Sequence, residues 1–526
     1  MPAALSYPGV YIEEIPSGVR TITGVATSIT AFVGRAPRGP IDRPVTVTSW
    51  DDFVRNFGAL DLGYPLGFAV RDFYLNGGAQ AVIARVFKAK DASNPTAQID
   101  AKGLKLQASS PGTWANTLRA RVTKTDVAKL TDIADLLGVP AASLFNLTIY
   151  DTKTKTTEEF INLTAATPSA RHVTGVLANG SDLVRTAGTP ADPTAAHPEP
   201  QPGQDIWKDD NLSSKVDPAA ADSDSLATAS DFGDDSTGAG LGLLAQADLF
   251  NLLCIPPDSL VGDVPIGLHA IAAKYCVTRR ALYIVDPPKD WTSADTNTVK
   301  PDTLKITGTD ARNAALYFPR VIEGNPLHGD QPETFVACGA IAGIMARTDV
   351  ARGVWKAPAG VDASLTGVLA PAVRLNDAQN GLLNPIGVNC LRSFPIIGNV
   401  VWGARTLRGA DVLGDEYKYV PVRRVALFIE ESLFRGLKWV VFEPNDEPLW
   451  GQIRLNVGAF MQDLFRQGAF QGTSARDAYF VKCDKDTTTQ SDINHGIVNV
   501  VVGFAPLKPA EFVVLKIQQL AGQIQS

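Results

Sequence analysis

The clearest candidates for covalent catalysis in this chain are Asp286, His328 and Ser474, the serine standing in a Gly-Thr-Ser-Ala run. A carboxylate that orients a histidine, and a histidine that takes the proton of a serine hydroxyl, together produce a nucleophile for attack on a carbonyl carbon. The chain order Asp, His, Ser fits one known protease arrangement, but order alone does not bring three side chains within hydrogen-bond reach. We therefore predict that Ser474 lies in a turn between a helix and a strand and has no catalytic role.

Other motifs that could bind a ligand are weaker. Asp286 ends an apolar run before two prolines, a usual position for an α/β active site, yet such a residue also simply begins a turn. The GAGLG run of residues 238–242 lacks a preceding strand and the spacing of a dinucleotide loop, which indicates a linker. No two histidines have metal-ligand spacing, and the five cysteines form no CxxC motif. We expect no catalytic, cofactor or metal site.

The charge of the chain indicates protein partners. The formal net charge is -7 with a pI near 5.4, and no block of Lys and Arg could neutralise several phosphates, which argues against nucleic-acid binding. The longest apolar runs are shorter than the ~18 residues of a membrane span, and the N-terminus has no basic region followed by an apolar run. We expect cytoplasmic synthesis and no membrane insertion.

A compact α/β unit is expected within the first ninety residues. Ser49 predicts the cap of an amphipathic helix, and Gly58 predicts its end. A second helix is predicted from Pro65 to Asn76, and a strand over residues 79–87 follows at once.

The next region has a different composition. Residues 91–240 are rich in Ala, Thr, Asp, Ser and Pro, and short alternating runs at 118–122 and 145–149 predict a small β-rich insertion. From residue 179 onward large apolar residues are sparse, which favours long exposed loops. Residues 241–380 then alternate apolar strands with helices, as expected for an α/β layer with a largely parallel sheet.

The C-terminal region is predicted to be α+β. One helix opens at Pro421, and a second presents an apolar face between Ile453 and Leu464. Strands that these helices could cover are predicted at 498–504 and at 511–517, the latter close to the chain end.

Both chain ends carry apolar strands without a local partner. Residues 7–15 lie between prolines and can be extended, but nothing beside them supplies a sheet. An exposed strand of this kind can add to the sheet edge of another subunit. We predict donation of both ends to neighbouring copies, the alternative being pairing within one subunit. The residues predicted to take part are Tyr7, Val10, Tyr11, Ile12, Ile15, Val498, Val500, Val502, Phe512, Val514 and Lys516.

Seven segments are the most distinctive in the chain. They are PGVYIEE (8–14), FVGRAPRGP (32–40), LNGGAQAVIARV (75–86), ARTDVARGVWKAPAG (346–360), NPIGVNCLRSFPIIGNVVWGARTL (384–407), FEPNDEPLW (442–450) and FMQDLFRQGAFQG (460–472). In this order they resemble contractile tail sheath proteins of phages and related injection machines, over nearly the whole chain except 91–240.

The resemblance implies a multidomain α/β and α+β protein. It has an α+β inner domain built from both chain ends, a subtilisin-like α/β middle domain without protease activity, and a β-rich outer insertion. The boundaries expected are 1–20 for a donated N-terminal arm, 21–90 for the N-terminal part of the conserved core, 91–240 for the insertion, 241–380 for the middle domain, 381–505 for the C-terminal domain and 506–526 for a C-terminal arm.

The resemblance also implies a function. Many copies would polymerise helically around an inner tube and contract to drive that tube through a target cell envelope. Expected partners are further copies, the inner tube protein, and baseplate and tail terminator proteins, in a virion tail or free contractile particle made in the bacterial cytoplasm. We assign tube contact to the helix near 453–467, whose polar face carries Arg454 and Arg466. The alternatives are a subtilase-like α/β hydrolase and a non-contractile filament.

Overall fold

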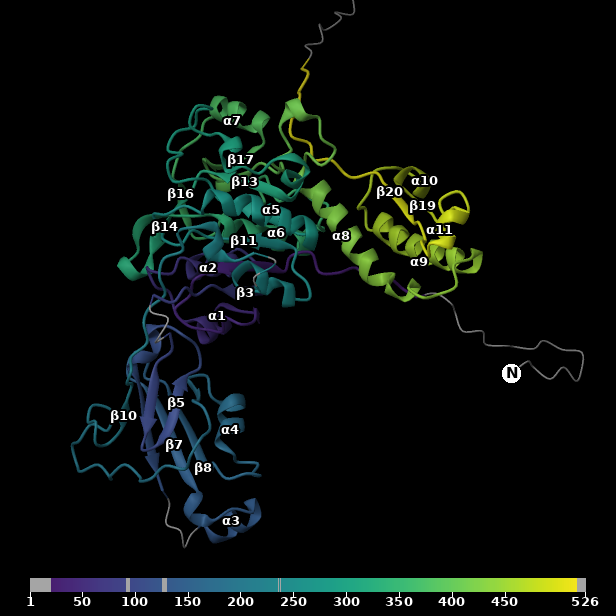
Figure 1. The fold of residues 1–526 in the computed structure, drawn as a ribbon. Coiled ribbons are helices and arrows are strands. Elements are labelled where there is room, and N and C mark those ends of the chain that lie inside the picture. The colour runs from purple at the N-terminus through teal and green to yellow at the C-terminus, as the bar shows by residue number, and fades with distance from the viewer. Residues whose placement is uncertain (1–19, 91–94, 125–129, 235, 237, 518–526) are drawn as a thin grey trace, which may run out of the picture.

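The computed structural model describes residues 20–90, 95–124, 130–234, 236 and 238–517. Figure 1 shows them as three parts: a central body, an elongated domain below it and a helical lobe beside it. The elongated domain is inserted between two stretches of chain that both belong to the body, and the lobe follows the body toward the C-terminus.

The body is built on an eight-stranded sheet with the order β18-β17-β13-β12-β11-β1-β3-β2. The inner strands run parallel, while β2 and β18 lie antiparallel at the two edges. β1, β3 and β13 are buried along their whole length, as expected for parallel strands with both faces covered. The strands are β1 (Thr30–Gly34), β2 (Val45–Val47), β3 (Ala81–Arg85), β11 (Leu252–Cys254), β12 (Leu282–Val285), β13 (Ala314–Phe318), β17 (Val388–Phe394) and β18 (Gly398–Trp402).

Helices cover both faces of this sheet. Successive residues of a strand enter opposite cores: Cys254 contacts the core beneath α1, α2 and α6, and Leu253 contacts the core beneath α5 and α7. α2 approaches α6 closely because Gly339 faces it; a Cβ there would stand 1.9 Å from the Ala69 carbonyl oxygen. The helices are α1 (Trp50–Phe57), α2 (Leu66–Leu75), α5 (Ile266–Arg279), α6 (Cys338–Arg352) and α7 (Asp377–Leu383).

The elements predicted near the N-terminus are confirmed. α1 follows Ser49, whose Oγ accepts a hydrogen bond from the Asp52 N–H at 3.1 Å, and it ends at Gly58 with φ at 97°. α2 follows Pro65, and β3 lies within the strand predicted at 79–87. β1 pairs with both β3 and β11, so these elements complete the sheet of the body.

The predicted boundary at residue 380 is wrong. β17 and β18 lie beyond it, yet β17 pairs with β13 and β18 closes the edge of the same sheet. Buried strands have the same apolar character on both sides of residue 380, so composition does not mark where the body ends. The body ends instead where the chain enters α8 (Val420–Gly436).

A small sheet with the order β15-β14-β16 contacts α2 through a group of buried charges. Arg71 Nη2 donates hydrogen bonds to Asp72 Oδ1 and to Glu323 Oε2, both at 2.9 Å, and each acidic residue is 2% exposed. Burial raises the pKa of Asp72 to about 6, and burial together with the charge of Asp72 raises the pKa of Glu323 to about 9. The strands are β14 (Val321–Asn325), β15 (Gln331–Phe335) and β16 (Val368–Pro371).

Glu323→Gln is expected to stabilise the protein at alkaline pH. The unfolded glutamate releases its proton near pH 4.5 and the folded one near pH 9, so the free energy of unfolding falls as the pH rises between these values. Glutamine does not titrate, so the variant should exceed the wild type by about 1–3 kcal/mol at pH 9 and match it at pH 4. Urea unfolding at both pH values measures the difference. Glu333→Gln, at the facing position of β15, should bring no such gain. A pH-independent effect of Glu323→Gln would contradict the raised pKa of Glu323 as the cause.

The elongated domain has its own core between two sheets, β4-β5-β9 and β10-β6-β7-β8. The strands predicted at 118–122 and 145–149 are confirmed as β6 and β7. The elements are β4 (Gln98–Ala101), β5 (Leu104–Ala108), β6 (Leu118–Thr123), α3 (Thr131–Leu137), β7 (Phe145–Asp151), β8 (Thr157–Leu163), α4 (Val173–Gly180), β9 (Val184–Thr186) and β10 (Ser214–Lys215).

The segment after residue 179, predicted to be long exposed loops, is partly packed. His197 is 2% exposed, and its Nδ1 accepts a hydrogen bond from the Val122 N–H at 3.0 Å, which ties the long connection to β6. Burial lowers the pKa of His197 to about 4, so the ring is neutral at pH 7. A single buried histidine among prolines forms no periodic pattern, which is why the sequence did not indicate this contact.

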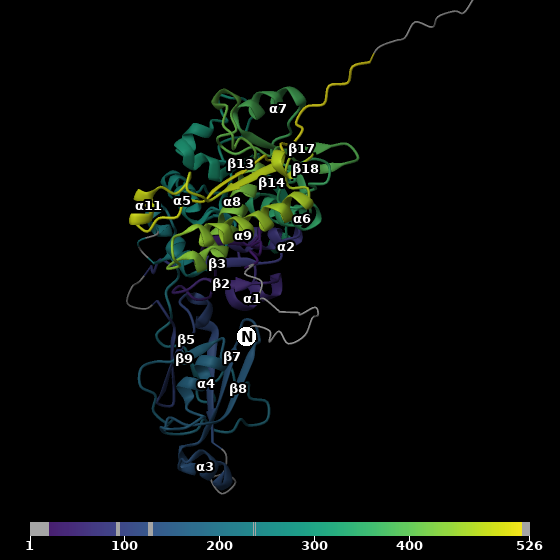
Figure 2. The same ribbon diagram turned by 90° about the vertical axis from the view of Figure 1, so that its right-hand side faces the viewer.

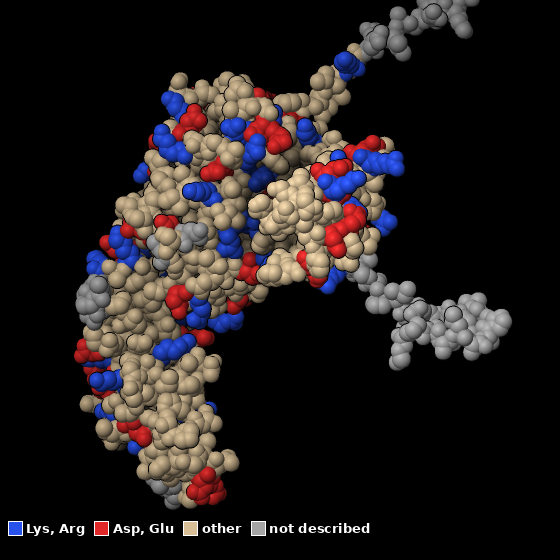
Figure 3. Space-filling model, turned by 45° about the vertical axis from the view of Figure 1, so that its right-hand side comes forward, with Lys and Arg blue, Asp and Glu red and all other residues tan. Residues whose placement is uncertain are grey.

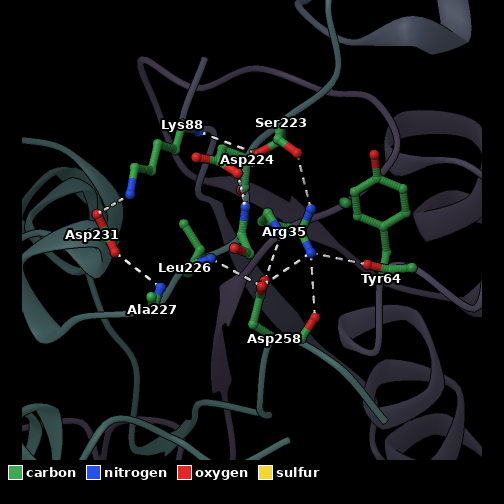
Figure 4. A network of polar contacts seen from close by, with 12 residues as sticks. Arg35, Tyr64, Lys88, Ser223, Asp224, Leu226, Ala227, Asp231 and Asp258 are labelled. Carbon is green, nitrogen blue, oxygen red and sulfur yellow. Dashed lines mark hydrogen bonds and ion pairs between the residues drawn. The ribbon is translucent and has the colours of Figure 1, made fainter. Parts of the chain in front are cut away.

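A polar network holds the elongated domain to the body (Figure 4). Arg35 donates to the Asp258 carboxylate through Nε at 2.5 Å and Nη2 at 3.0 Å, and Asp258 also accepts the Leu226 N–H at 2.9 Å. Lys88, on the chain entering the domain, pairs with Asp231, on the chain leaving it, at 2.9 Å. Both connecting segments are therefore fixed to the body.

The lobe contains the two helices predicted in the C-terminal region, α8 and α9, and both are confirmed. Their apolar faces form one core that also takes in Ile22, so residues from near both ends of the chain build the lobe. The elements after α8 are α9 (Glu447–Arg466), α10 (Ala475–Ala478), β19 (Tyr479–Lys482), α11 (Gln490–Asn494) and β20 (Val501–Phe504).

Candidate assembly interface

The lobe carries a sheet of two strands. β19 and β20 pair with each other in antiparallel register, with Tyr479 opposite Phe504 and Lys482 opposite Val501. One face packs on the lobe core through Val481 and Val502. Among the described residues, no strand pairs with the outer edge of β19 or of β20. Both edges therefore present backbone N–H and C=O groups that another strand could pair with.

Exposed apolar side chains lie on this sheet. Phe480 is 49% exposed and Val501 45%. The Phe480 ring lies across its cross-strand partner Gly503, where a Cβ would stand 2.2 Å from the ring. An open sheet edge beside exposed apolar side chains can bind a further strand through backbone hydrogen bonds and apolar contacts.

Three residues assigned above to a donated strand lie instead in their own lobe. β20 covers only Val501–Phe504, so Val498 and Val500 precede it. Val502 pairs with Val481 of β19, and all three valines pack partly buried against the lobe core. Their alternation is that of a strand with one covered face, and such a pattern cannot tell whether the covering core belongs to the same copy.

The chain beyond the lobe returns to the body and then leaves it. Arg405, which is 0% exposed, donates to both carboxylate oxygens of Glu511, through Nε at 2.8 Å and Nη2 at 2.6 Å. Burial acts to lower the pKa of Arg405, but the hydrogen bonds and charge of Glu511 outweigh it and the pKa is raised. Glu511 therefore anchors the start of the C-terminal segment.

The segment after Glu511, predicted as a last strand, forms no strand within the subunit. Figure 2 shows it running away from the body as a single extended trace. It is nevertheless strongly apolar: Phe512 is 75% exposed and Ile517 91%. Three more exposed apolar residues lie between them, Val513, Val514 and Leu515, and Lys516 is exposed as well.

The predicted N-terminal arm, residues 7–15 with Tyr7, Val10, Tyr11, Ile12 and Ile15, lies outside the described residues. The first described residue is already bound to the lobe. The Arg20 N–H donates to Asn456 Oδ1 at 3.1 Å, and the Arg20 guanidinium lies 4.6 Å from the centre of the Trp439 ring. The chain thus enters the subunit along α9.

A buried ion pair joins the lobe to the body. Arg424 of α8 donates to Asp349 of α6 at 2.8 and 2.5 Å, and the two side chains are 3% and 4% exposed. The Thr27 hydroxyl donates a hydrogen bond to Asp349 at 2.6 Å, and the Thr27 carbonyl oxygen accepts one from Arg424 at 3.0 Å. None of these three residues is among the predicted site residues, although Asp349 is the one acid in the distinctive segment 346–360.

The two arginines assigned to tube contact differ in their surroundings. Arg454 pairs with Glu447 at 2.5 Å and also donates to the Cys483 carbonyl oxygen, so its charge is used within the lobe. Arg466 is 73% exposed and its nearest carboxylate, Asp463, is 3.9 Å away. On the face shown in Figure 3, basic and acidic side chains are interspersed over body and lobe.

Family models match both the body and the lobe. A model described as the phage tail sheath protein central domain matches residues 250–407, and one described as the phage tail sheath C-terminal domain matches residues 414–519. Together they take in half of the 526 residues. The chain belongs to the contractile tail sheath family.

Curated sheath proteins are similar to parts of the chain. The tail sheath protein of Vibrio phage KVP40 is 26% identical over 201 residues, which is 37% of this chain and 29% of that protein. The tail sheath protein of Enterobacteria phage T4 is 23% identical over 270 residues, 50% of this chain and 36% of that one. The chain's matches thus span less than half the length of these curated relatives.

Solved sheath structures share the fold over almost the entire chain. The sheath of an extracellular contractile injection system in the contracted state is 22% identical, with a TM-score of 0.57 over 98% of both chains. A sheath tail protein from Listeria innocua is 13% identical, with a TM-score of 0.58 over 93% of this chain and 96% of that one.

In this member of the sheath family the three residues in protease order have separate partners. Ser474 caps α10 and donates its hydroxyl to Asp477 at 2.7 Å, which agrees with the predicted turn. His328 pairs with Glu333 beside β15. Asp286 is buried at the start of α6, where its Oδ1 accepts the N–H groups of Ala337 and Cys338, both at 3.0 Å. No contact brings these three together.

The remaining motifs of this sheath protein also have structural explanations. The GAGLG run leads into a buried 3-10 turn, Gly240–Gln246, rather than a strand-to-helix loop. Within the part of the chain that the structure describes, no three His, Cys, Asp or Glu side chains are grouped as metal ligands. The cysteines are buried free thiols. None of the helices in the described ranges is long and apolar enough to cross a membrane.

Proposed function

We propose that this protein is the repeating subunit of a contractile sheath, which polymerises helically around an inner tube and shortens to drive that tube through a target cell envelope. The observation that carries the proposal is the match of the two sheath domain models to the body and the lobe. The inner tube protein, baseplate and tail terminator are the remaining partners. The particle is a phage tail or a free contractile machine made in a bacterial cytoplasm.

Copies are linked by donated strands in this proposal. Residues 512–517 add to the β19 edge of one neighbour's lobe, and residues 7–15 add to the β20 edge of another's. The open edges and the exposed apolar C-terminal segment support this. Head-to-tail contacts to two different neighbours build an open helix when the rotation between copies does not close a ring. With about four to six hydrogen bonds and two or three buried side chains, each arm contributes on the order of 10 kcal/mol before ordering costs.

The body has no catalytic task in this proposal. We take it as the subtilisin-like middle domain of the family in which Asp286 and His328 serve structure alone. Contraction draws on more favourable contacts between copies rather than on nucleotide hydrolysis. Arg466, with its exposed charge, contacts the tube; unchanged sheath assembly around tubes by Arg466→Glu would exclude that role.

Electron microscopy of purified particles tests the function. Two sheath lengths are expected, one long and narrow, one short and wide, and triggered shortening should persist after ATP depletion with apyrase. A single sheath length under all conditions would favour a non-contractile filament. Labelling of Ser474 by a fluorophosphonate probe would favour a hydrolase instead.

A further inference from the structure

A groove with a volume of about 890 Å³ lies where the body, the end of α9 and the C-terminal segment meet. The turn after α6 forms one wall, β18 another, and residues 507–512 a third. The turn after α6 belongs to the distinctive segment 346–360. The sheath function proposed above assigns no ligand to this groove.

The groove is electropositive. Arg352, Lys356 and Lys508 line it, and no carboxylate among the described residues lies within ion-pair distance of them. Glu511 is the one acid in the lining, and both of its oxygens are bound to Arg405 at 2.8 and 2.6 Å. Three cations therefore face the groove without a local counter-charge.

The groove also offers aromatic surface. Trp355 and Trp402 line it, and Trp402 is 37% exposed while packing edge-on against Phe394. This combination suits an extended peptide with acidic and aromatic side chains, which needs counter-charge and stacking surface.

One wall of the groove follows β20 directly along the chain. Past that strand, the Gln471 N–H donates to the Ala505 carbonyl oxygen at 2.9 Å, and Phe470 and Pro506 form a bridge. Residues 507–512 then form the groove wall. A strand added along β20 and running in the same direction therefore leads into the groove.

One segment of the chain has matching chemistry. Residues 1–19 contain Glu13 and Glu14 and no lysine or arginine, with Tyr7 and Tyr11 just before the acids. We propose that the groove receives the Glu13–Glu14 pair of a second copy's N-terminal arm, with Arg352, Lys356 and Lys508 as its counter-charges. The arm then runs parallel to β20, with residues 7–12 beside the strand and the acids beyond it. The inference rests on the strand donation proposed above.

A charge-swap experiment on the full chain tests this. Lys356→Glu with Lys508→Glu reverses the groove, and Glu13→Lys with Glu14→Lys reverses the arm without touching any described residue. Each double variant should raise the critical concentration for sheath formation about tenfold at 50 mM NaCl, measured by sedimentation. A chain carrying all four substitutions should assemble within about twofold of wild type.

Mixing the two double variants tests whether arm and groove belong to different copies. In an equimolar mixture every lysine arm can meet a glutamate groove and every glutamate arm a lysine groove, so assembly should recover. Recovery in the four-fold variant without recovery in the mixture would place the arm in its own subunit's groove and overturn the proposal. Lys485→Glu, an exposed charge elsewhere in the lobe, is the matched control and should assemble normally.

The outcomes separate this inference from the proposed function. If either double variant assembles at the wild-type concentration while deletion of residues 1–15 abolishes assembly, the groove is not the arm's site although strand donation holds. If wild-type chains form no sheath under any condition, the proposed function itself fails.

Discussion

Removal of residues 1–15, or of residues 512–526, is expected to leave a folded subunit that no longer polymerises. Neither deletion removes a described core residue, and the second one keeps Glu511 with its anchor Arg405. Each arm contributes on the order of 10 kcal/mol to a contact between copies before ordering costs, so its loss should move assembly beyond attainable protein concentrations. Sedimentation and electron microscopy measure assembly, and circular dichroism with thermal unfolding measures folding.

Two controls make the deletion test specific. A chain in which Gly and Ser replace residues 512–517 keeps its length and should fail like the deletion. Leu136→Ser removes an equally exposed side chain, 86% exposed, from the tip of the elongated domain and should assemble normally. Tubes of normal length from either arm deletion would refute strand donation.

Asp349→Ala is expected to cost about 3–5 kcal/mol of folding free energy, a large share of the stability of a typical domain. The substitution leaves the Arg424 guanidinium buried without its counter-charge and removes the acceptor of the Thr27 hydroxyl. Because α8 and α6 meet at this pair, the lobe should loosen from the body first. Denaturant unfolding, with hydrogen exchange on α8, measures both effects.

The double variant Asp349→Leu, Arg424→Met separates the charge effect from packing. It removes both charges and should recover much of the lost stability, because replacing a buried ion pair with apolar side chains is often neutral. Asp377→Ala breaks a pair with Arg392 in which the aspartate is 95% exposed, and it should cost less than about 1 kcal/mol. A cost of Asp349→Ala as small as that of Asp377→Ala would contradict the proposed coupling.

Several elements were predictable because nearby residues determine them. Ser49 begins α1 through a side-chain hydrogen bond, and Gly58 ends it with a positive φ. Both effects are local. The resemblance to the sheath family was also predictable, because it depends only on the order of residues in the distinctive segments. Strands of the body were recognisable by their apolar character, but their order was not, because β1 pairs with β11 more than two hundred residues away.

The candidate interface was only partly predictable. The sequence indicated apolar, strand-like chain ends, and the exposed residues 512–517 agree with this. It could not indicate that Val502 pairs within its own lobe. Alternating apolar residues show that one face of a strand is buried, but not which subunit buries it. The sequence also did not indicate the roles of Arg405, Arg424 and Asp349. A charged residue stabilises the fold in this way only when it is buried away from water, and burial is not visible in the sequence.

The sequence by itself therefore determined the helices with local caps, the strand-like segments and the family they resemble. Tertiary structure alone decided which strand edges stay open, where the lobe joins the body, and that three cations gather around one groove. The physical reason is range. Caps and alternation arise from neighbours within a few residues, whereas an open edge, a buried ion pair and a groove depend on which distant segments pack together.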